Sequence, residues 1–517
     1  LAQRCGCLPM ALRAAGALLK KPGMTPEFVN QKLTAAYERL QLTDPERENL
    51  TVAVAFQASY DQLNPDLQRY WRSLAIFPAD FNAKAADAVW RTEDAPAALT
   101  QALSVFDRLL TSTSAPKPPD AWEVLSELQT ACLVDHTTGR WRLHDLARDF
   151  TRTLCAAAEI DALAYRHAAY YVNVLAEAKH LYLKGGEQAL AGLALFDHER
   201  TNIEAGQAWA AAHPADPAAA RLCNLYPDAG TYVIGLRLHP RAQIAWLEAA
   251  LTAAQKLGNR QYEGHHLGNL GLAWAAISEP RRAMEYHEKH LVITREIGDR
   301  RGEGAALNNL GNSWAALDES RRAIGYYEQA LAIDREIGDR RSEGNTLNNL
   351  GLAWADLDEP RRAIDYYEQR LSIAREIGDR RGEGKSLGNL GLACTTLNEP
   401  HRAISYLEQG LVIIREIGDQ RSEGSILGGL GIAYQNLGEL EKASGYYEQQ
   451  MTLARAIGDR LGEANACWNL GLLLEGQGEL PRAVELMQIC VDYERYIGHP
   501  NADKDAARVE QIRQKLK

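Results

Sequence analysis

The sequence predicts an all-α fold in which a solenoid of stacked helical hairpins follows a smaller segment of mixed helices with one β-hairpin. From Gln261 onward the chain repeats itself every 40 residues without insertion or deletion. The blocks begin at Gln261, Arg301, Arg341, Arg381, Arg421 and Leu461. Within a block, apolar residues recur at i, i+3, i+4 and i+7, the spacing of one face of a helix. Each block therefore predicts two antiparallel helices.

The block from Arg341 shows where these helices should begin and end. Pro360 suits the first turn of the second helix, where its missing N–H is no loss, and Gly378 suits the end of that helix. Asp379 is then placed to cap the next helix. Gly351 is small where the two helices of a hairpin must approach closely. One pair alone buries its apolar residues incompletely, so neighbouring pairs are expected to stack.

A family resemblance rests on Leu350 and Gly351, an aromatic residue at Trp354, Ala363, and an aromatic residue at Tyr367. In this order they resemble the tetratricopeptide repeat, and the pattern recurs from block to block. The resemblance implies a right-handed superhelical solenoid with a groove lined by the first helix of each pair. The period exceeds the usual 34 residues by about six. A weaker copy of the second helix precedes the clear blocks, so the array is expected to span 219–500, with 501–517 as a capping helix.

Asparagines recur on the predicted first helices. With one lysine, these candidate groove residues are Asn269, Asn308, Asn309, Asn312, Asn345, Asn348, Asn349, Lys385, Asn389 and Asn469. A side-chain amide offers donors and an acceptor, so a row of amides could hold the backbone of a peptide ligand. The alternative is that the asparagines form hydrogen bonds between neighbouring repeats. Arginines at each turn, such as Arg340 beside Glu343, are predicted to be solvated cap and intrahelical pairs rather than an anion site.

The N-terminal part of the chain lacks the 40-residue period and carries motifs of another kind. The stretch CGCLPMALRAAGALL from Cys5 resembles the helix that follows the nucleotide-binding core of NB-ARC proteins, the STAND class of signalling ATPases. Leu8, Pro9 and Ala11 match the Gly-Leu-Pro-Leu-Ala motif of that family, whereas Cys7 replaces its glycine. The resemblance implies that Pro9 contacts a nucleotide in an intact parent protein.

Two further stretches, 63–90 and 128–150, resemble the winged-helix module of the same family. The second also predicts a hairpin from its own pattern, because apolar runs flank Thr137-Thr138-Gly139 and a helix capped by Asp145 follows. Its Leu-His-Asp matches the family's Met-His-Asp motif, which implies that His144 faces the phosphates of ADP in the parent. The stretch 196–210 resembles the family's helical connector. The expected domains before the array are a helical segment at 1–55, a winged helix at 56–155 and a connector at 156–218.

Composition and charge exclude several classes of protein. A net charge of -11 disfavours a nucleic-acid partner, since such binding relies on an excess of Lys and Arg. No run of 18 or more apolar residues is present, and the first residues do not form a signal peptide. We therefore expect a cytoplasmic protein without a membrane partner. Because the chain begins with Leu inside an apparent helix, we expect it to be part of a longer polypeptide.

No motif for catalysis is present. The sequence has no G-x-x-x-x-G-K-[ST] phosphate loop, no H-E-x-x-H and no G-x-S-x-G. The chain is therefore not expected to be an enzyme, to carry a cofactor or to hold a metal ion. ADP or ATP is implied only for the intact parent.

The leading hypothesis is the sensor portion of a STAND-type signalling protein. Its groove would bind a protein or peptide, and its winged helix would relay this to an ADP/ATP switch, with oligomerisation of the parent on activation left open. One alternative is a transcription regulator whose winged helix binds DNA. This alternative is based on a cluster of basic residues around the predicted hairpin, Arg140, Arg142, Arg148 and Arg152. The other alternative is a passive scaffold for protein interactions.

Overall fold

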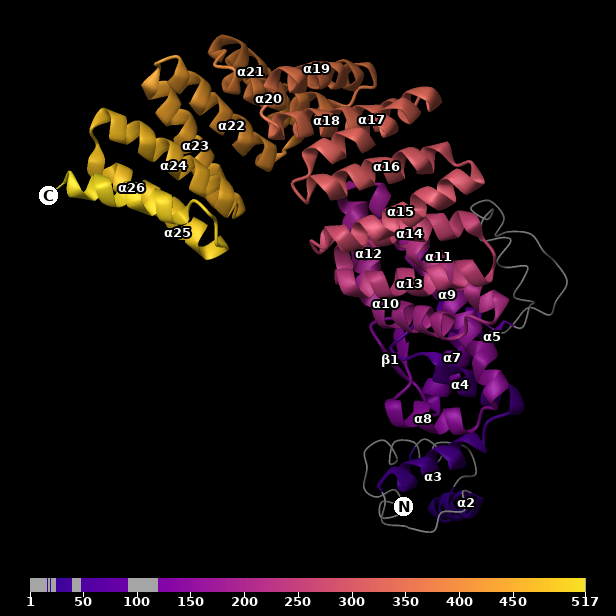
Figure 1. Cartoon of the computed structure of the whole chain (residues 1–517). Helices are drawn as coiled ribbons and strands as arrows, with labels where there is room; N and C mark the ends of the chain where they lie inside the picture. The colour runs from indigo at the N-terminus through magenta and orange to yellow at the C-terminus, as the bar shows by residue number, and fades with distance from the viewer. Residues whose placement is uncertain (1–15, 17–18, 20–24, 40–47, 92–119, 517) are drawn as a thin grey trace. The chain divides into compact units, whose positions relative to one another are not determined.

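A computed structural model describes residues 16, 19, 25–39, 48–91 and 120–516 of the chain. It divides into a first unit, Leu1–Ala273, and a second unit, Trp274–Lys517 (Figure 1). The boundary falls inside helix α14 (Arg260–Ala276). The stretch predicted to resemble the NB-ARC helix, with Cys5 and Pro9, lies outside the described residues.

The first unit is helical with one small sheet. Its other elements are α2 (Pro26–Arg39), α3 (Glu48–Tyr60), α4 (Pro65–Ser73), the 3-10 turn η1 (Leu74–Ile76), α5 (Ala83–Trp90), α7 (Ala121–Thr130), β1 (Asp135–Thr137), β2 (Arg140–Arg142), α8 (Asp145–Thr153), α9 (Ala157–Leu183), α10 (Gly186–Ala212), α11 (Pro217–Ala229), α12 (Thr231–Arg237) and α13 (Pro240–Lys256). Aromatic side chains fill its core. Trp71, Phe77, Phe81, Trp141 and Tyr171 are almost completely buried in one cluster.

The predicted hairpin is present. Strands β1 and β2 pair antiparallel, with Asp135 opposite Arg142, and Thr138 and Gly139 turn the chain with φ values of 50° and 79°. Two residues with positive φ form the turn that fits the twist of a hairpin. The backbone of Phe81 also pairs with that of Trp141, which ties the hairpin to the loop before α5.

The predicted cap of helix α8 is wrong by one residue. His144, not Asp145, is the N-cap, and its Nδ1 accepts a hydrogen bond of 3.2 Å from the backbone N–H of Leu146. Asp145 is the first residue of the helix, and its carboxylate lies 3.0 Å from Arg148. The imidazole can replace a carboxylate as acceptor because its unprotonated nitrogen is oriented toward the free N–H groups of the first turn.

The second unit is a solenoid of antiparallel helix pairs, visible as successive hairpins in Figure 1. Its helices after the end of α14 are α15 (Pro280–Ile297), α16 (Arg300–Ala315), α17 (Ser320–Ile337), α18 (Arg340–Asp356), α19 (Pro360–Glu376), α20 (Arg380–Thr396), α21 (Pro400–Ile417), α22 (Gln420–Asn436), α23 (Leu440–Ile457), α24 (Arg460–Gln477), α25 (Leu480–Ile497) and α26 (Ala502–Gln514). The repeating all-α architecture predicted from the 40-residue period is thereby confirmed.

The positions that set the helix ends behave as predicted. Pro360 begins α19, Gly378 has a φ of 69°, and the carboxylate of Asp379 accepts a hydrogen bond of 2.9 Å from the N–H of Gly382. A Cβ added to Gly351 would lie only 2.3 Å from Cε1 of Tyr367. Glycine is therefore required there for α18 and α19 to pack closely.

Helix α26 packs against α25. Val509 and Ile512 of α26 are buried in a cluster with Val484, Met487 and Val491 of α25. Charged residues occupy much of the rest of α26. The structure thus places a helix where the capping segment is predicted.

Candidate functional site

The predicted groove residues of the second unit lie on α16, α18, α20 and α24, the first helices of their pairs. We call the surface formed by Asn308, Asn309, Asn312, Asn345, Asn348, Asn349, Lys385, Asn389 and Asn469 the first-helix face. Asn312, Asn345 and Lys385 are exposed, and the others are half-buried. Asn269 lies on α14 within the first unit and is not part of this surface.

Several of these asparagines contact one another across repeats. Nδ2 of Asn349 lies 3.1 Å from Oδ1 of Asn308 and 3.1 Å from Oδ1 of Asn312, one repeat upstream. Nδ2 of Asn389 donates in the same way to Oδ1 of Asn348, at 3.2 Å. These are the inter-repeat hydrogen bonds of the alternative interpretation. They leave two exposed side chains of the face best placed for a ligand: Asn345, and Lys385, whose Nζ lies 3.9 Å from the carboxylate of Asp419.

The asparagine row is interrupted in α22, where Gly428 and Gly429 occupy the equivalent positions. There the surface sinks into a hollow of about 780 Å³, which we call the C-terminal hollow. Residues of α20, α22, α23, α24, α25 and α26 line it, and Asn469 of the first-helix face is among them. Its volume is in the range of sites that hold a small ligand or a peptide side chain.

Sequence reasoning missed the C-terminal hollow. The signal was the pair of glycines at positions where other blocks carry asparagine. Gly428 leaves room for Gln450, whose amide would lie within 2.8–3.0 Å of a Cβ at that position. Gln450 is 6% exposed, lines the hollow, and its Oε1 has no hydrogen-bond partner. An unpartnered buried polar atom is unusual and costly, which marks it as a candidate contact for a ligand.

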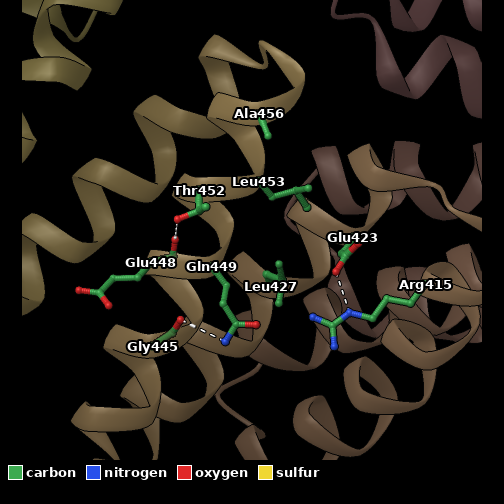
Figure 2. Close-up of a pocket in the computed structure, with 9 residues that line it drawn as sticks. All are labelled: Arg415, Glu423, Leu427, Gly445, Glu448, Gln449, Thr452, Leu453 and Ala456. Atoms are coloured by element: carbon green, nitrogen blue, oxygen red, sulfur yellow. Dashed lines mark hydrogen bonds and ion pairs between the residues drawn. The ribbon is translucent and has the colours of Figure 1, made fainter.

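A second hollow, of about 460 Å³, lies between α21, α22 and α23 (Figure 2). Its polar side chains bond within its own wall. Nε of Arg415 lies 2.7 Å from Glu423, the Thr452 hydroxyl donates to the Glu448 carbonyl at 2.8 Å, and Gln449 donates to the Gly445 carbonyl at 3.3 Å, as Figure 2 shows. Because these groups are already paired, this hollow is a weaker candidate for a ligand-binding site than the C-terminal hollow.

The arginines at the turns pair with glutamates. Arg380 contacts Glu383 of its own helix at 2.8 Å and Glu416, at the end of α21, at 2.7 Å. Arg340 makes the equivalent contacts with Glu343 and Glu376. The intrahelical pairs were predicted, whereas the contacts to the second helix of the same helix pair were not. Because about half of each arginine is exposed, each pair should contribute little to stability.

The basic residues near the hairpin are largely engaged within the chain. Arg140 pairs with Glu199 and Asp80. Arg148 donates to the carbonyl of Pro78 at 3.0 Å, and Arg152 to the carbonyl of Ala75 at 3.3 Å. Arg142 is 63% exposed and lies 3.9 Å from Asp145. These contacts reduce the positive charge available to DNA at this place.

His144 is exposed at the start of α8. Because its Nδ1 accepts a hydrogen bond, the neutral ring carries its proton on Nε2, which points a donor away from the helix. Its Nε2 is therefore available to donate a hydrogen bond to a ligand.

Metal-binding clusters and membrane-spanning helices are two further features to consider in the described residues. Among the residues that the structure describes, no group of three or more His, Cys, Asp or Glu side chains is placed to hold a metal ion. None of the described helices is both long and apolar enough to cross a lipid bilayer.

The stacked antiparallel helix pairs define a helical-repeat solenoid, and comparison with known families is consistent with this class. Residues 302–376, 342–416 and 422–491 match the tetratricopeptide repeat model. The search of curated proteins gave no significant match.

Several solved structures resemble the chain remotely. A STAND protein with a tetratricopeptide repeat sensor from Pyrococcus horikoshii is 18% identical, with a TM-score of 0.47, over 97% of this chain and 75% of that one. The apo quorum sensor NprR from B. thuringiensis is 13% identical, with a TM-score of 0.46, over 81% of this chain and 99% of that one. Aspartyl phosphate phosphatase F from Bacillus subtilis is 15% identical, with a TM-score of 0.41, over 66% and 94%. Similarities this remote say nothing about what this chain binds.

Proposed function

We propose that the repeat array binds a protein or peptide ligand on its first-helix face, and that the chain is the sensor portion of a STAND-type signalling protein. The observation that carries the first part is the continuity of exposed Asn345 and Lys385 with the C-terminal hollow along successive first helices. Leu352 of α18, which is 44% exposed, and Leu461 at the hollow, which is 53% exposed, add apolar surface. Polar and apolar groups together suit an extended peptide.

The second part rests on the motif resemblance in the N-terminal region. In this proposal Pro9 and His144 contact ADP or ATP in the intact parent, and the segment 56–155 is its winged helix. The exposed Nε2 of His144 supports this, because an imidazole N–H can donate to a phosphate oxygen. The chain itself is proposed to be cytoplasmic, non-enzymatic and free of a cofactor, and the parent to oligomerise when activated.

A ligand switches such a protein only by binding one arrangement more tightly than another. A tenfold preference contributes about 1.4 kcal/mol to the equilibrium between them. Within the first unit, the contact of Arg140 with Glu199 joins the hairpin to α10, so a movement of that helix would carry the hairpin with it.

The test is capture of a partner from cells of the source organism by the full chain. The groove variant combines Asn345→Ala, Leu352→Ala and Lys385→Ala, all at exposed positions of the first-helix side. The matched control combines Glu328→Ala, Ser372→Ala and Val412→Ala, exposed on second helices. We expect one partner to be retained by the wild type and the control and lost by the groove variant. Equal capture by all three, or none by any, would refute the proposal.

A further inference from the structure

The C-terminal hollow has an excess of negative charge. Asp459, Glu494 and Asp505 line it, against one arginine, Arg421. Asp459 is the N-cap of α24 and accepts a hydrogen bond of 3.0 Å from the N–H of Gly462, so one of its carboxylate oxygens is already engaged. Glu494, near the end of α25, and Asp505, in the first turn of α26, are therefore the carboxylates most available to a ligand.

Glu494 is incompletely satisfied. Its side chain is 12% exposed, its Oε1 lies 3.5 Å from Nδ1 of His499, and its Oε2 is buried without a hydrogen-bond partner. Burial, together with the charge and close approach of the Asp505 carboxyl, raises the pKa of the Glu494 carboxyl, although the charge of His499 opposes the shift. A carboxylate in this state gains from any cation that enters, because the cation supplies both charge and donors.

A neutral acceptor and an aromatic ring complete the site. Gln450 is 6% exposed and lies in the wall of the hollow, and its Oε1 has no hydrogen-bond partner. Trp468, which is half-buried, presents an indole to the same space. Carboxylates beside an indole form a favourable environment for a guanidinium or an alkylammonium group. A metal ion fits less well, because the described residues contain no group of three ligating side chains.

We propose that the C-terminal hollow binds the charged end of an arginine or lysine side chain of the peptide that occupies the first-helix face. Glu494 and Asp505 supply the counter-charge, Gln450 contacts the N–H groups, and Trp468 covers the side-chain stem. This rests on the proposed peptide-binding function and adds its specificity: the ligand carries a basic residue where it reaches α22 and α24. Long side chains suit such a site, since their methylenes bury while the charge reaches a partner.

The test uses the full chain and four blocked pentapeptides of Gly-Gly-Xaa-Gly-Gly, in which Xaa is arginine, lysine, norleucine or glutamate. Saturation-transfer NMR suits weak binding to a large protein. We expect binding of the arginine and lysine peptides alone. The variants Glu494→Gln and Asp505→Asn should each weaken that binding by about tenfold or more, since a hydrogen-bonded charge is lost. Glu485→Gln, an exposed substitution on the same helix, should leave it unchanged.

Equal binding of the norleucine and arginine peptides, no binding of either, or full binding to Glu494→Gln and Asp505→Asn would overturn the inference. Melting temperature and helical content establish that each variant is folded. If Glu494→Gln does not fold, Asp505→Asn, on the half-exposed first turn of α26, provides the test instead. Failure here is separable from failure of the proposed function. A partner lost from the groove variant but retained by Glu494→Gln and Asp505→Asn refutes only the basic-residue inference. Arginine binding without any captured partner refutes only the proposed function.

Discussion

Nη1 of Arg140 lies 2.5 Å from Oε1 of Glu199, and the two side chains join strand β2 of the hairpin to helix α10. Glu199 is 4% exposed at its side chain and Arg140 is 15% exposed. Arg140 also contacts Asp80, and Asn202 donates to the Asp80 carbonyl at 2.9 Å. A buried charge pair with further hydrogen bonds fixes geometry more than it adds stability, since both charges lose their hydration.

Removing one partner of this pair should be strongly destabilising. Glu199→Gln leaves the buried guanidinium with only the partly exposed carboxylate of Asp80 as a counter-charge, and we expect a loss of about 1.5–3 kcal/mol in the unfolding free energy of the first unit. The control is Glu204→Gln, which breaks the exposed pair of Arg200 and Glu204 on the same helix. That change should cost at most about 1 kcal/mol. Urea unfolding followed by tryptophan fluorescence makes the comparison, and equal losses would contradict the assignment.

The close approach of α18 and α19 predicts a glycine effect. In Gly351→Ala the added methyl would meet the Tyr367 ring, so we expect a loss of about 1–3 kcal/mol from overpacking. Gly325→Ala is the matched control, because a Cβ there has no neighbour within 4 Å and the residue lies inside α17. It should gain about 0.5–1 kcal/mol from helix propensity. Thermal unfolding measures both variants. A lower melting temperature for Gly351→Ala with a higher one for Gly325→Ala supports the close packing of Gly351 on Tyr367, whereas stabilisation by both substitutions would contradict it.

The asparagine contacts predict a division of roles along the first-helix face. Asn349→Ala removes two hydrogen bonds to the previous repeat and should destabilise the array by about 1–2 kcal/mol. Asn345→Ala, at an exposed position four residues earlier on the same helix, should change stability by less than about 0.5 kcal/mol. Denaturant midpoints measure both. If Asn349→Ala left the stability unchanged but abolished capture of the protein partner, the asparagine row would be a ligand-binding site rather than a set of hydrogen bonds between repeats.

Buried histidines predict an acid-sensitive fold. Burial lowers the pKa of His266 to about 4, although Asp228 opposes the shift and His265 adds to it, and Nε2 of His266 lies 3.0 Å from Oδ1 of Asn224. Because the folded pKa is below the unfolded value of about 6.5, the neutral ring stabilises the fold fully above pH 6.5. Stability is lost as pH falls from there toward 4, by up to about 1.4 kcal/mol per pH unit for this histidine.

The window from pH 6.5 to 5 separates this effect from most carboxylates, which titrate lower. We expect His266→Gln to reduce the slope of stability against pH in that window, since glutamine does not titrate and still offers a donor to Asn224. Urea midpoints at half-unit pH intervals measure it. An unchanged slope would show that His266 is not a source of the acid sensitivity.

The helices and their ends could be predicted because their causes are local. Pro360, Gly378 and Asp379 act on the backbone within one turn, and the 40-residue period repeats these signals. The shift of the α8 cap from Asp145 to His144 shows the limit of that reasoning, since both residues can accept from a free N–H and geometry chooses between them.

The parts that could not be predicted depend on distant segments. The contact of Arg380 with Glu416 joins residues 36 apart, and Arg140 meets Glu199 across 59 residues. The C-terminal hollow forms only where Gly428, Gln450 and Glu494 come together, from three helices whose patterns give no sign of one another. The asparagine row was visible in the sequence, but the direction of each amide was not, so both its interpretations remained open.

Hydrogen–deuterium exchange of the full chain, alone and with its captured partner, tests the central claim most directly. If a ligand lies along the first-helix face, exchange should slow in α18, α20, α22 and α24, and the groove variant should show no such protection. Protection confined to the hairpin and α8, or absent from these four helices, would contradict the account and move the binding site to the first unit.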